Sequence, residues 1–482
     1  MSQINETTLR TPGVYTTEIP TLPPSVAQVS TAIPAFIGYT QIHQDSDGND
    51  LTLKPTKIYS LKDYEDQFGF AENEKDIEIN IVRKTENGVV SLKSALAQFK
   101  SGKTASPNNM YYSLRLYFEN GGGPCYIVSV GNTGGIIDPG DDTKGLQGGL
   151  KALEAYDEPT LIVFPEGQGV ANGADYYALI VQALLQCANL QDRFAIPDVY
   201  VQGNTTNKSI TDFRSGLASS DNLNYGAVYY PNLKTTFDFQ YNEADLDVNI
   251  DLDGTPTTVK MDKLKTPTNP ADQDLAAYYA AQNALKKLSP NLPPSPAMAG
   301  IYARVDGTRG VWKAPANVSV NSVYETTDFI TDAEQADMNV DAGSGKSVNA
   351  IRFFNGKGIL VWGARTLDGN SNEWRYISVR RFFIMVEESA KKATFPFVFE
   401  PNDANTWIKV RGMLENYLTV LWRQGALAGA KPEQAFFVKC GLGQTMSAQD
   451  ILDGKLIVEI GMAAVRPAEF IILRFMHKLQ ES

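Results

Sequence analysis

The residues that could support catalysis are few and lie far apart in this sequence of 482 residues. Its two histidines, His43 and His477, have no plausible catalytic partner nearby in the sequence, which argues against histidine acid–base chemistry. Asp157 and Glu158 are adjacent carboxylates followed by Pro159, and a loop or helix end explains them better than glycoside hydrolysis. We therefore predict no catalytic residues and no enzyme activity.

Two further patterns resemble ligand sites but lack residues that those sites require. Residues 343–347 (GSGKS) match the end of a phosphate-binding loop, but Val340 stands where the full motif has glycine, and no strand is evident before it. The alternating carboxylates of residues 241–253 lack the central glycine and the terminal glutamate of an EF-hand loop. We predict solvated polar segments at both places, without a metal or another cofactor.

Composition and cysteine usage indicate an ordinary globular protein. Hydrophobic residues make up 43% of the chain and charged residues 20%. No apolar run approaches the roughly 20 residues that span a bilayer, and the N-terminus lacks the parts of a signal peptide. We therefore expect synthesis and folding in a bacterial cytoplasm, without direct membrane insertion. Cys125, Cys187 and Cys440 lie in apolar runs without metal-ligand spacing, which predicts buried free thiols.

The net charge of −12 is unevenly distributed along the chain. From Ala350 to Ser482 there are 17 Lys and Arg against 13 Asp and Glu, so the acidic excess lies in the first 349 residues. An acidic majority argues against nucleic acid as a partner, because phosphate binding needs a concentrated basic surface. The mildly basic C-terminal third could face an acidic protein, and ordinary scatter of surface charge explains it equally well.

The elements that would position any site differ between the two parts of the chain. Between residues 123 and 231, apolar strands at 125–130, 160–164, 193–199 and 225–230 alternate with helices at 146–156 and 175–190. This pattern predicts βαβ units and a mainly parallel sheet. The polar stretch 233–289 reads as a surface insertion with a hairpin at Asp253 and Gly254 and a helix over about 272–288. Residues 45–50 and 85–106 are expected to be exposed loops.

The C-terminal third, from about residue 349, predicts an α+β domain. We expect strands at 358–362, 395–399, 436–440 and 456–460, and helices at 379–392 and 405–424. The second helix carries an apolar stripe that includes Trp407, Leu414 and Leu421, which indicates core packing. The expected fold class is therefore α/β plus α+β.

Both ends of the chain resemble β-strands with nothing nearby to pair with. Residues 11–19 are β-rich, and the proline-rich tract 20–34 prevents a hairpin because proline cannot donate to a strand ladder. Residues 469–477 are apolar on both faces and lie close to the C-terminus. Strand exchange between subunits would pair both segments, and pairing within their own chain is the alternative. The residues predicted for this exchange are Val14, Tyr15 and Ile19 in the N-terminal arm, Phe470, Ile471, Ile472, Leu473, Arg474, Phe475 and Met476 in the C-terminal arm, and Leu456, Ile457, Val458 and Ile460 in an acceptor strand spanning 456–464.

Many collinear blocks resemble the tail sheath family of contractile phages and related contractile injection systems. The blocks are residues 11–15 (TPGVY), 23–26 (PPSV), 31–38 (TAIPAFIG), 125–128 (CYIV), 192–196 (DRFAI), 299–304 (AGIYAR), 309–317 (RGVWKAPAN), 363–366 (GART), 399–402 (FEPN), 421–426 (LWRQGA), 435–438 (AFFV) and 465–470 (VRPAEF). The insertion at 233–289 and the loops before residue 120 do not match closely.

The resemblance implies a structural subunit that polymerises as stacked hexameric rings around an inner tube and contracts to drive the tube through an envelope. Its implied partners are other copies of itself, the inner tube protein, baseplate and tail terminator proteins, and, as an open possibility, a paralogous sheath chain. The implied organisation is an N-terminal arm at 1–33, an outer α/β domain at 34–348, an inner tube-facing α+β domain at 349–467 and a C-terminal arm strand at 468–482. The candidates for tube contact are Lys391, Lys392, Lys409 and Arg411, for which solvated helix charge is an equal alternative.

Two other functions compete with the polymerising sheath. A sheath-cap or baseplate component of the same particle would not polymerise, and a cytoplasmic α/β enzyme is supported only by the βαβ segment. Arms at both ends favour the polymerising role. The particle would be a phage tail or a contractile injection particle, and the sequence does not separate these two.

Overall fold

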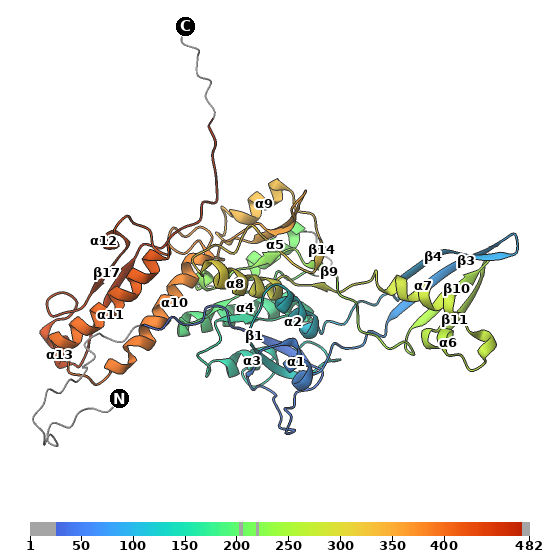
Figure 1. Ribbon diagram of the computed structural model, residues 1–482, viewed down its shortest axis with the longest axis horizontal. Coiled ribbons are helices and arrows are strands. Elements are labelled where there is room, and N and C mark those ends of the chain that lie inside the picture. The colour runs from blue at the N-terminus through green and yellow to red at the C-terminus, as the bar shows by residue number, and fades with distance from the viewer. Residues whose placement is uncertain (1–25, 202–205, 218–220, 475–482) are drawn as a thin grey trace, which may run out of the picture. The chain divides into compact units, whose positions relative to one another are not determined.

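The computed structural model describes residues 26–201, 206–217 and 221–474 of the chain (Figure 1). The predicted N-terminal strand with Val14, Tyr15 and Ile19 lies outside these residues, as do Phe475 and Met476. Contacts divide the chain into two compact units. Unit 1 contains Val386–Val465 and the N-terminal segment up to Val29, and unit 2 contains Ser30–Met385 and the C-terminal segment from Arg466. The boundary expected at residue 349 falls inside unit 2.

The centre of unit 2 is a five-stranded sheet in the order β2-β5-β1-β6-β7. Its strands are β1 (Pro34–Thr40), β2 (Thr56–Ile58), β5 (Cys125–Asn132), β6 (Leu161–Val163) and β7 (Phe194–Ala195). All neighbouring strands are parallel except β2, which runs antiparallel to β5. This is the mainly parallel arrangement that the alternating strand and helix pattern predicts.

Helices cover both faces of this sheet. Strand β1 is therefore buried on both sides, which explains why its sequence is almost entirely apolar. Phe36 packs edge-to-face on Tyr117 of α2 (Met110–Glu119), with ring centroids 5.1 Å apart. The next residue, Ile37, lies against Gly149 of α3 (Gly145–Leu153), where a Cβ atom would be only 2.5 Å from Ile37. Successive side chains of a strand point to opposite faces, so all seven residues of β1 are buried.

The remaining elements of this part of unit 2 surround the parallel sheet. The helices are α1 (Leu61–Phe68), α4 (Gly173–Leu190), α5 (Thr206–Gly216), α8 (Ser295–Arg309) and α9 (Asp332–Asn339). A four-stranded sheet contains β8 (Tyr229–Tyr230), β13 (Val318–Ser319), β15 (Asn349–Phe354) and β16 (Gly358–Val361), and a three-stranded sheet contains β9 (Leu233–Thr235), β12 (Asn291–Leu292) and β14 (Val323–Thr326). Because β15 pairs with β8, the chain around residue 349 folds with unit 2.

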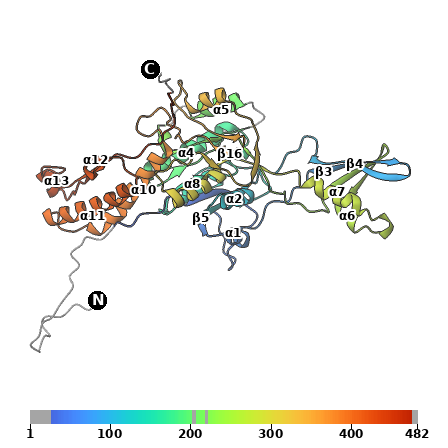
Figure 2. The same cartoon turned by 45° about the horizontal axis from the view of Figure 1, so that its top comes forward.

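The surface insertion at 233–289 shares a four-stranded sheet with residues 77–99 and also contributes α6 (Met261–Lys265) and α7 (Leu275–Leu285) (Figures 1 and 2). The strand order is β11-β10-β3-β4, with strands β3 (Ile77–Glu86), β4 (Val89–Phe99), β10 (Asp247–Leu252) and β11 (Thr255–Lys260). The hairpin predicted at Asp253 and Gly254 is confirmed. The loop expected at 85–106 is present only over residues 100–106, because Asn87 and Gly88 form a second tight turn, both with positive φ, that joins β3 to β4.

Unit 1 contains the end of α10 (Ile377–Thr394), α11 (Ala404–Arg423), α12 (Pro432–Ala435), α13 (Ala448–Leu452), β17 (Phe436–Lys439) and β18 (Glu459–Met462). The Asp403 carboxylate accepts a hydrogen bond from the Thr406 amide and so caps α11. The predicted apolar stripe of α11 is buried at Val410, Leu414 and Leu421, and Trp407 is half-buried. None of the helices in the described part of the chain is long and apolar enough to cross a membrane.

Two strand predictions in unit 1 need correction. The strand expected at 395–399 is wrong: Phe395–Phe397 is a single 3₁₀ turn, and its central Pro396 has no N–H to donate to a strand ladder. The strand expected at 456–460 is only partly present, because β18 begins at Glu459 and residues 456–458 have no ladder partner among the described residues.

Candidate assembly surface

The smallest sheet in the described part of the chain lies in unit 1 and consists of β17 and β18. The two strands are antiparallel, with Phe436 opposite Met462 and Val438 opposite Ile460. Within the described residues, no other strand pairs with the outer edge of either one. A two-stranded sheet of four-residue strands is marginally stable by itself, and a strand edge without a partner presents unpaired N–H and C=O groups.

An apolar groove of about 750 Å³ lies beside this sheet in unit 1. One wall is the extended chain before and into β18, and it contributes three alternate residues, Leu456, Val458 and Ile460, which therefore point to the same face. The opposite wall includes Val410 and Leu414 of α11. The groove is completed by Ala390, Lys391 and Thr394 of α10, residues 397–400, Asn402 and Gly454.

The structure brings three of the four predicted acceptor residues into one groove and leaves out the fourth. Ile457 does not line the groove, and its carbonyl accepts a hydrogen bond of 2.7 Å from the Thr445 hydroxyl. The rim of the groove is also apolar, since Phe395, Val398 and Phe399 are exposed. Phe399 has a positive φ of 68°, which is uncommon for a bulky residue outside a tight turn.

The predicted C-terminal arm leaves unit 2 without secondary structure. Residues 466–474 belong to no helix or strand, and the four apolar side chains Phe470, Ile471, Ile472 and Leu473 are between 70% and 78% exposed. Four consecutive exposed apolar residues cannot all be buried by one sheet face, so both faces of this segment need partners. Arg474 is also exposed and ends the described part of the arm.

The carboxylate of Glu469 fixes the start of this arm, a role that the sequence analysis missed. Arg365 donates two hydrogen bonds to it, from Nε to Oε1 at 2.9 Å and from Nη2 to Oε2 at 2.7 Å. Asn339 Nδ2 donates to Oε1 at 2.7 Å, and the Tyr376 hydroxyl donates to Oε2 at 3.2 Å. Both Arg365 and Glu469 lie in blocks that carry the family resemblance, so the blocks themselves were the available signal.

The predicted tube-facing cations are largely engaged by their own helices. Lys391 and Lys392 both pair with the buried carboxylate of Glu388, at 3.2 and 3.3 Å. Arg411 pairs with Glu415 at 3.7 Å, one turn further along α11. Lys409 is exposed on α11. The exposed Arg411–Glu415 pair is worth little at a surface, whereas the buried Glu388 would lose two cations if Lys391 and Lys392 moved to other partners.

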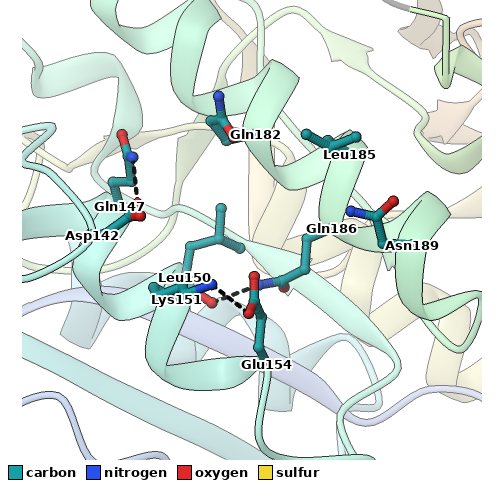
Figure 3. Close-up of a pocket in the computed structure, with 9 residues that line it drawn as sticks. All are labelled: Asp142, Gln147, Leu150, Lys151, Glu154, Gln182, Leu185, Gln186 and Asn189. Atoms are coloured by element: carbon teal, nitrogen blue, oxygen red, sulfur yellow. Dashed lines mark hydrogen bonds and ion pairs between the residues drawn. The ribbon is translucent and has the colours of Figure 1, made fainter.

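A second, polar groove of about 220 Å³ lies between α3 and α4 in unit 2 (Figure 3). Its charged groups are already paired: Lys151 Nζ lies 2.7 Å from Glu154 Oε2, and Gln147 Nε2 donates to Asp142 Oδ1 at 2.8 Å. Gln186 Nε2 donates to the Leu150 carbonyl at 2.7 Å, while Gln186 Oε1 has no partner. The residues that line the groove include no serine, threonine, cysteine or histidine.

Other groups with chemical potential are also held in structural contacts. Burial raises the pKa of the thiols of Cys125, Cys187 and Cys440, which are free and buried as predicted, so they favour the unreactive protonated form. Lys346, in the segment resembling a phosphate-binding loop, is buried and donates to the Arg214 carbonyl at 2.8 Å. The described residues contain no cluster of three metal-ligating side chains.

A family model, a known protein sequence and solved structures all match this chain to the same family. The sequence model of the phage tail sheath C-terminal domain matches residues 370–477. A tail sheath protein of Vibrio phage KVP40 is 23% identical over 180 residues, and this match covers 37% of this chain but only 25% of that protein.

Solved structures of contractile particles match almost the whole chain. A chain of the anti-feeding prophage (AFP) baseplate is 32% identical, with a TM-score of 0.62, over 98% of this chain and 100% of its own length. The AFP helical sheath in its contracted state is 31% identical, with a TM-score of 0.63, over 98% of this chain and 100% of its own length. The contracted sheath of PVC, an extracellular contractile injection system, is 30% identical, with a TM-score of 0.63, over 98% of both chains. The chain therefore belongs to the sheath protein family of contractile phage tails and contractile injection systems.

Proposed function

We propose that this protein is the polymerising sheath subunit of a contractile particle, stacked as hexameric rings around an inner tube. The observation that carries the proposal is that unit 1 is incomplete. Among the described residues, a two-stranded sheet with no further strand at either edge adjoins an apolar groove, and residues 470–473 form an exposed apolar segment. Arms donated by neighbouring subunits would supply the missing strands through main-chain hydrogen bonds.

The acceptor in this proposal is the sheet edge and groove formed by Leu456, Val458 and Ile460. A donated strand would pair with the free edge of β18 and place alternate apolar side chains into the groove. The donors would be Val14, Tyr15 and Ile19 of one neighbour and residues 470–476 of another. Such links stay intact when rings rotate and slide, which contraction without nucleotide hydrolysis requires.

The proposal also assigns the contact with the inner tube. Lys391, Lys392, Lys409 and Arg411 would bind acidic groups of the tube in the extended state and release them on contraction. Their present partners Glu388 and Glu415 would reclaim the cations after release. The full-length similarity to AFP and PVC sheaths supports an extracellular injection particle, assembled in a bacterial cytoplasm, over a phage tail. Baseplate and terminator proteins would lie at the two ends of the sheath.

Deletion of residues 1–19 tests the strand exchange directly. We expect a folded chain with an unchanged circular dichroism spectrum that no longer forms striated tubes with its tube protein in negative-stain electron microscopy. The full-length chain, co-expressed with the same tube protein, is the control. Normal tubes from the deletion variant would refute strand exchange through the N-terminal arm.

A second candidate function is a non-polymerising component at the baseplate or cap. It is favoured by one observation, namely that a full-length match comes from a structure of the AFP baseplate. A baseplate or cap component would add a single ring to preformed tubes and would not form long striated sheaths. Microscopy of the co-expressed full-length chain distinguishes the two roles.

A further inference from the structure

We propose that two buried arginines of unit 2, Arg365 and Arg381, clamp the roots of the two terminal arms, and that the C-terminal clamp is the tighter one. The arm roots are Glu469, where the C-terminal arm begins, and Thr31, just before β1. The inference rests on the proposed function, because it takes the arms to be the segments that link subunits. Arg365 and Arg381 act as positioning residues.

In the C-terminal clamp, residues of unit 2 other than the arm also hold Arg365 in place. Arg365 is 4% exposed, and Asn349 binds its backbone. The Arg365 N–H donates to Asn349 Oδ1, and Asn349 Nδ2 donates to the Arg365 carbonyl, both at 2.8 Å. Its Nη1 donates to the carbonyls of Asn339 and Gly369, both at 3.3 Å. The remaining donors, Nε and Nη2, therefore point in a fixed direction, and the Glu469 carboxylate fills this fork.

The N-terminal clamp uses a different arrangement. Arg381, which is also 4% exposed, forms an ion pair with Asp306 at 3.1 and 2.5 Å. The linker is held by both partners of this pair: Arg381 Nη2 donates to the Thr31 carbonyl at 2.8 Å, and the Thr31 hydroxyl donates to Asp306 Oδ2 at 2.6 Å. Thr31 therefore binds both members of the Arg381–Asp306 ion pair but contributes no charge to it.

This difference sets the order of strength. If Thr31 moves away, Arg381 and Asp306 still neutralise each other. If Glu469 moves away, Arg365 is left as a buried charge, and the described residues offer it no second carboxylate. Removing one member of a buried ion pair costs far more than removing a neutral hydrogen-bond partner. A pull on the arms should therefore loosen the N-terminal root first.

The clamps also determine which unit carries the load. The segment before the C-terminal root, residues 463–465, is hydrogen-bonded to residues 426–428 and 435 within unit 1. The chain then passes into unit 2 at Arg466, and Glu469 is bound there. Tension on the C-terminal arm therefore ends at Arg365 in unit 2 and does not reach the small sheet of unit 1, which must accept the neighbours' strands.

Pulsed electron paramagnetic resonance on the unassembled full-length chain tests the clamps. One variant carries spin labels on cysteines introduced at Ile471 and Lys151, and a second carries them at Ser30 and Lys151, so that the distance between the two labels can be measured. All three positions are exposed, whereas the three native thiols are buried. We expect Glu469→Gln to broaden the distance distribution of the first pair strongly, and Thr31→Val to broaden that of the second pair by less. Glu373→Gln, which removes an equally negative but exposed side chain of unit 2, should change neither.

The proposal is overturned if Glu469→Gln leaves the first distribution narrow, or if Thr31→Val has the larger effect. Arg365→Lys, which keeps the buried charge but loses the two-pronged geometry, replaces Glu469→Gln should that variant fail to fold. In tube assembly with the inner tube protein, Glu469→Gln should give fewer and shorter sheaths, and normal sheaths would refute the positioning role. Failure of the unmodified chain to assemble would instead refute the proposed function, while the distance measurements still decide on the clamps.

Discussion

Unit 2 and unit 1 differ in how completely each buries its own apolar surface. The continuous hydrophobic core runs from Ile33 to Ile384 and lies entirely within unit 2. Unit 1 has the buried stripe of α11, but it also has a two-stranded sheet, an open apolar groove and exposed aromatic residues such as Phe399 and Phe437. Unit 2 therefore packs its apolar side chains into one continuous core, whereas unit 1 leaves part of its apolar surface exposed, as the proposed strand exchange would require.

The largest effect should come from placing a charge in the groove of unit 1. Val458→Asp puts a carboxylate where a donated strand would exclude water, and burying an unpaired charge costs at least several kcal/mol. We expect complete loss of tube assembly in negative-stain microscopy with retained helical content. Val89→Asp, the same change at an exposed position of the unit 2 hairpin, should assemble normally. Normal assembly of Val458→Asp would show that the groove is not an acceptor.

Replacing a buried leucine by alanine in each unit should reduce the free energy of unfolding by different amounts. Leu114 on α2 and Leu418 on α11 are almost completely buried, at 0% and 1% exposure, but only Leu114 lies in the continuous core. We expect Leu114→Ala to reduce the free energy of unfolding by about 3–5 kcal/mol and Leu418→Ala by about 2–3 kcal/mol, because a thinner core relaxes more easily around a cavity. Denaturant unfolding of the unassembled chain measures both values. Equal losses would mean that the two cores are equally well packed.

A smaller effect should appear in the pH dependence of stability, and it should come from unit 2. Burial raises the pKa of Glu74 and Asp198 to about 7 and that of Glu166 to about 8, against the hydrogen bonds that these carboxyl groups accept. The folded chain therefore holds protons that the unfolded chain has already released above about pH 5. Stability should fall as the pH rises through about 7 to 8.

Thermal unfolding between pH 5.5 and pH 8.5 measures this dependence. Glu166→Gln removes one of the titrating groups and should flatten the dependence, while Glu400→Gln, an exposed carboxylate of unit 1, should leave it unchanged. A melting temperature that rises over this range would contradict the assignment of these buried carboxyl groups.

The sequence predicted best where a single segment determines its own environment. Strong periodicity located α4, α10 and α11, and continuous apolar runs located β5 and β6. The two strands around Asn87 and Gly88 were missed because most side chains of β4 are exposed and give no clear alternation, although the turn itself carries a strong hairpin signal. Residues 395–399 are apolar enough for a strand, but Pro396 has no N–H to donate to a strand ladder, and the segment forms a 3₁₀ turn instead.

The candidate assembly surface was predicted only in part, because a single segment shows one wall of it and not the other. Leu456, Val458 and Ile460 alternate, so the sequence indicated a common apolar face, but it could not show that α10 and α11 would form the opposite wall of a groove. Likewise, the predicted cations were visible as charges on helices, whereas their pairing with Glu388 and Glu415 required the helical geometry.

The amino-acid sequence was enough to predict the class of the protein, its family blocks, its buried thiols and the exposed apolar segment that ends the described chain. These properties depend on composition and on spacing within single elements. By contrast, the contacts of Arg365 with Glu469, 104 residues away, and of Arg381 with Thr31, 350 residues away, became visible only in the folded chain. Each of these residues would be equally acceptable in water by local criteria, so the pairings follow only from how unit 2 packs around them.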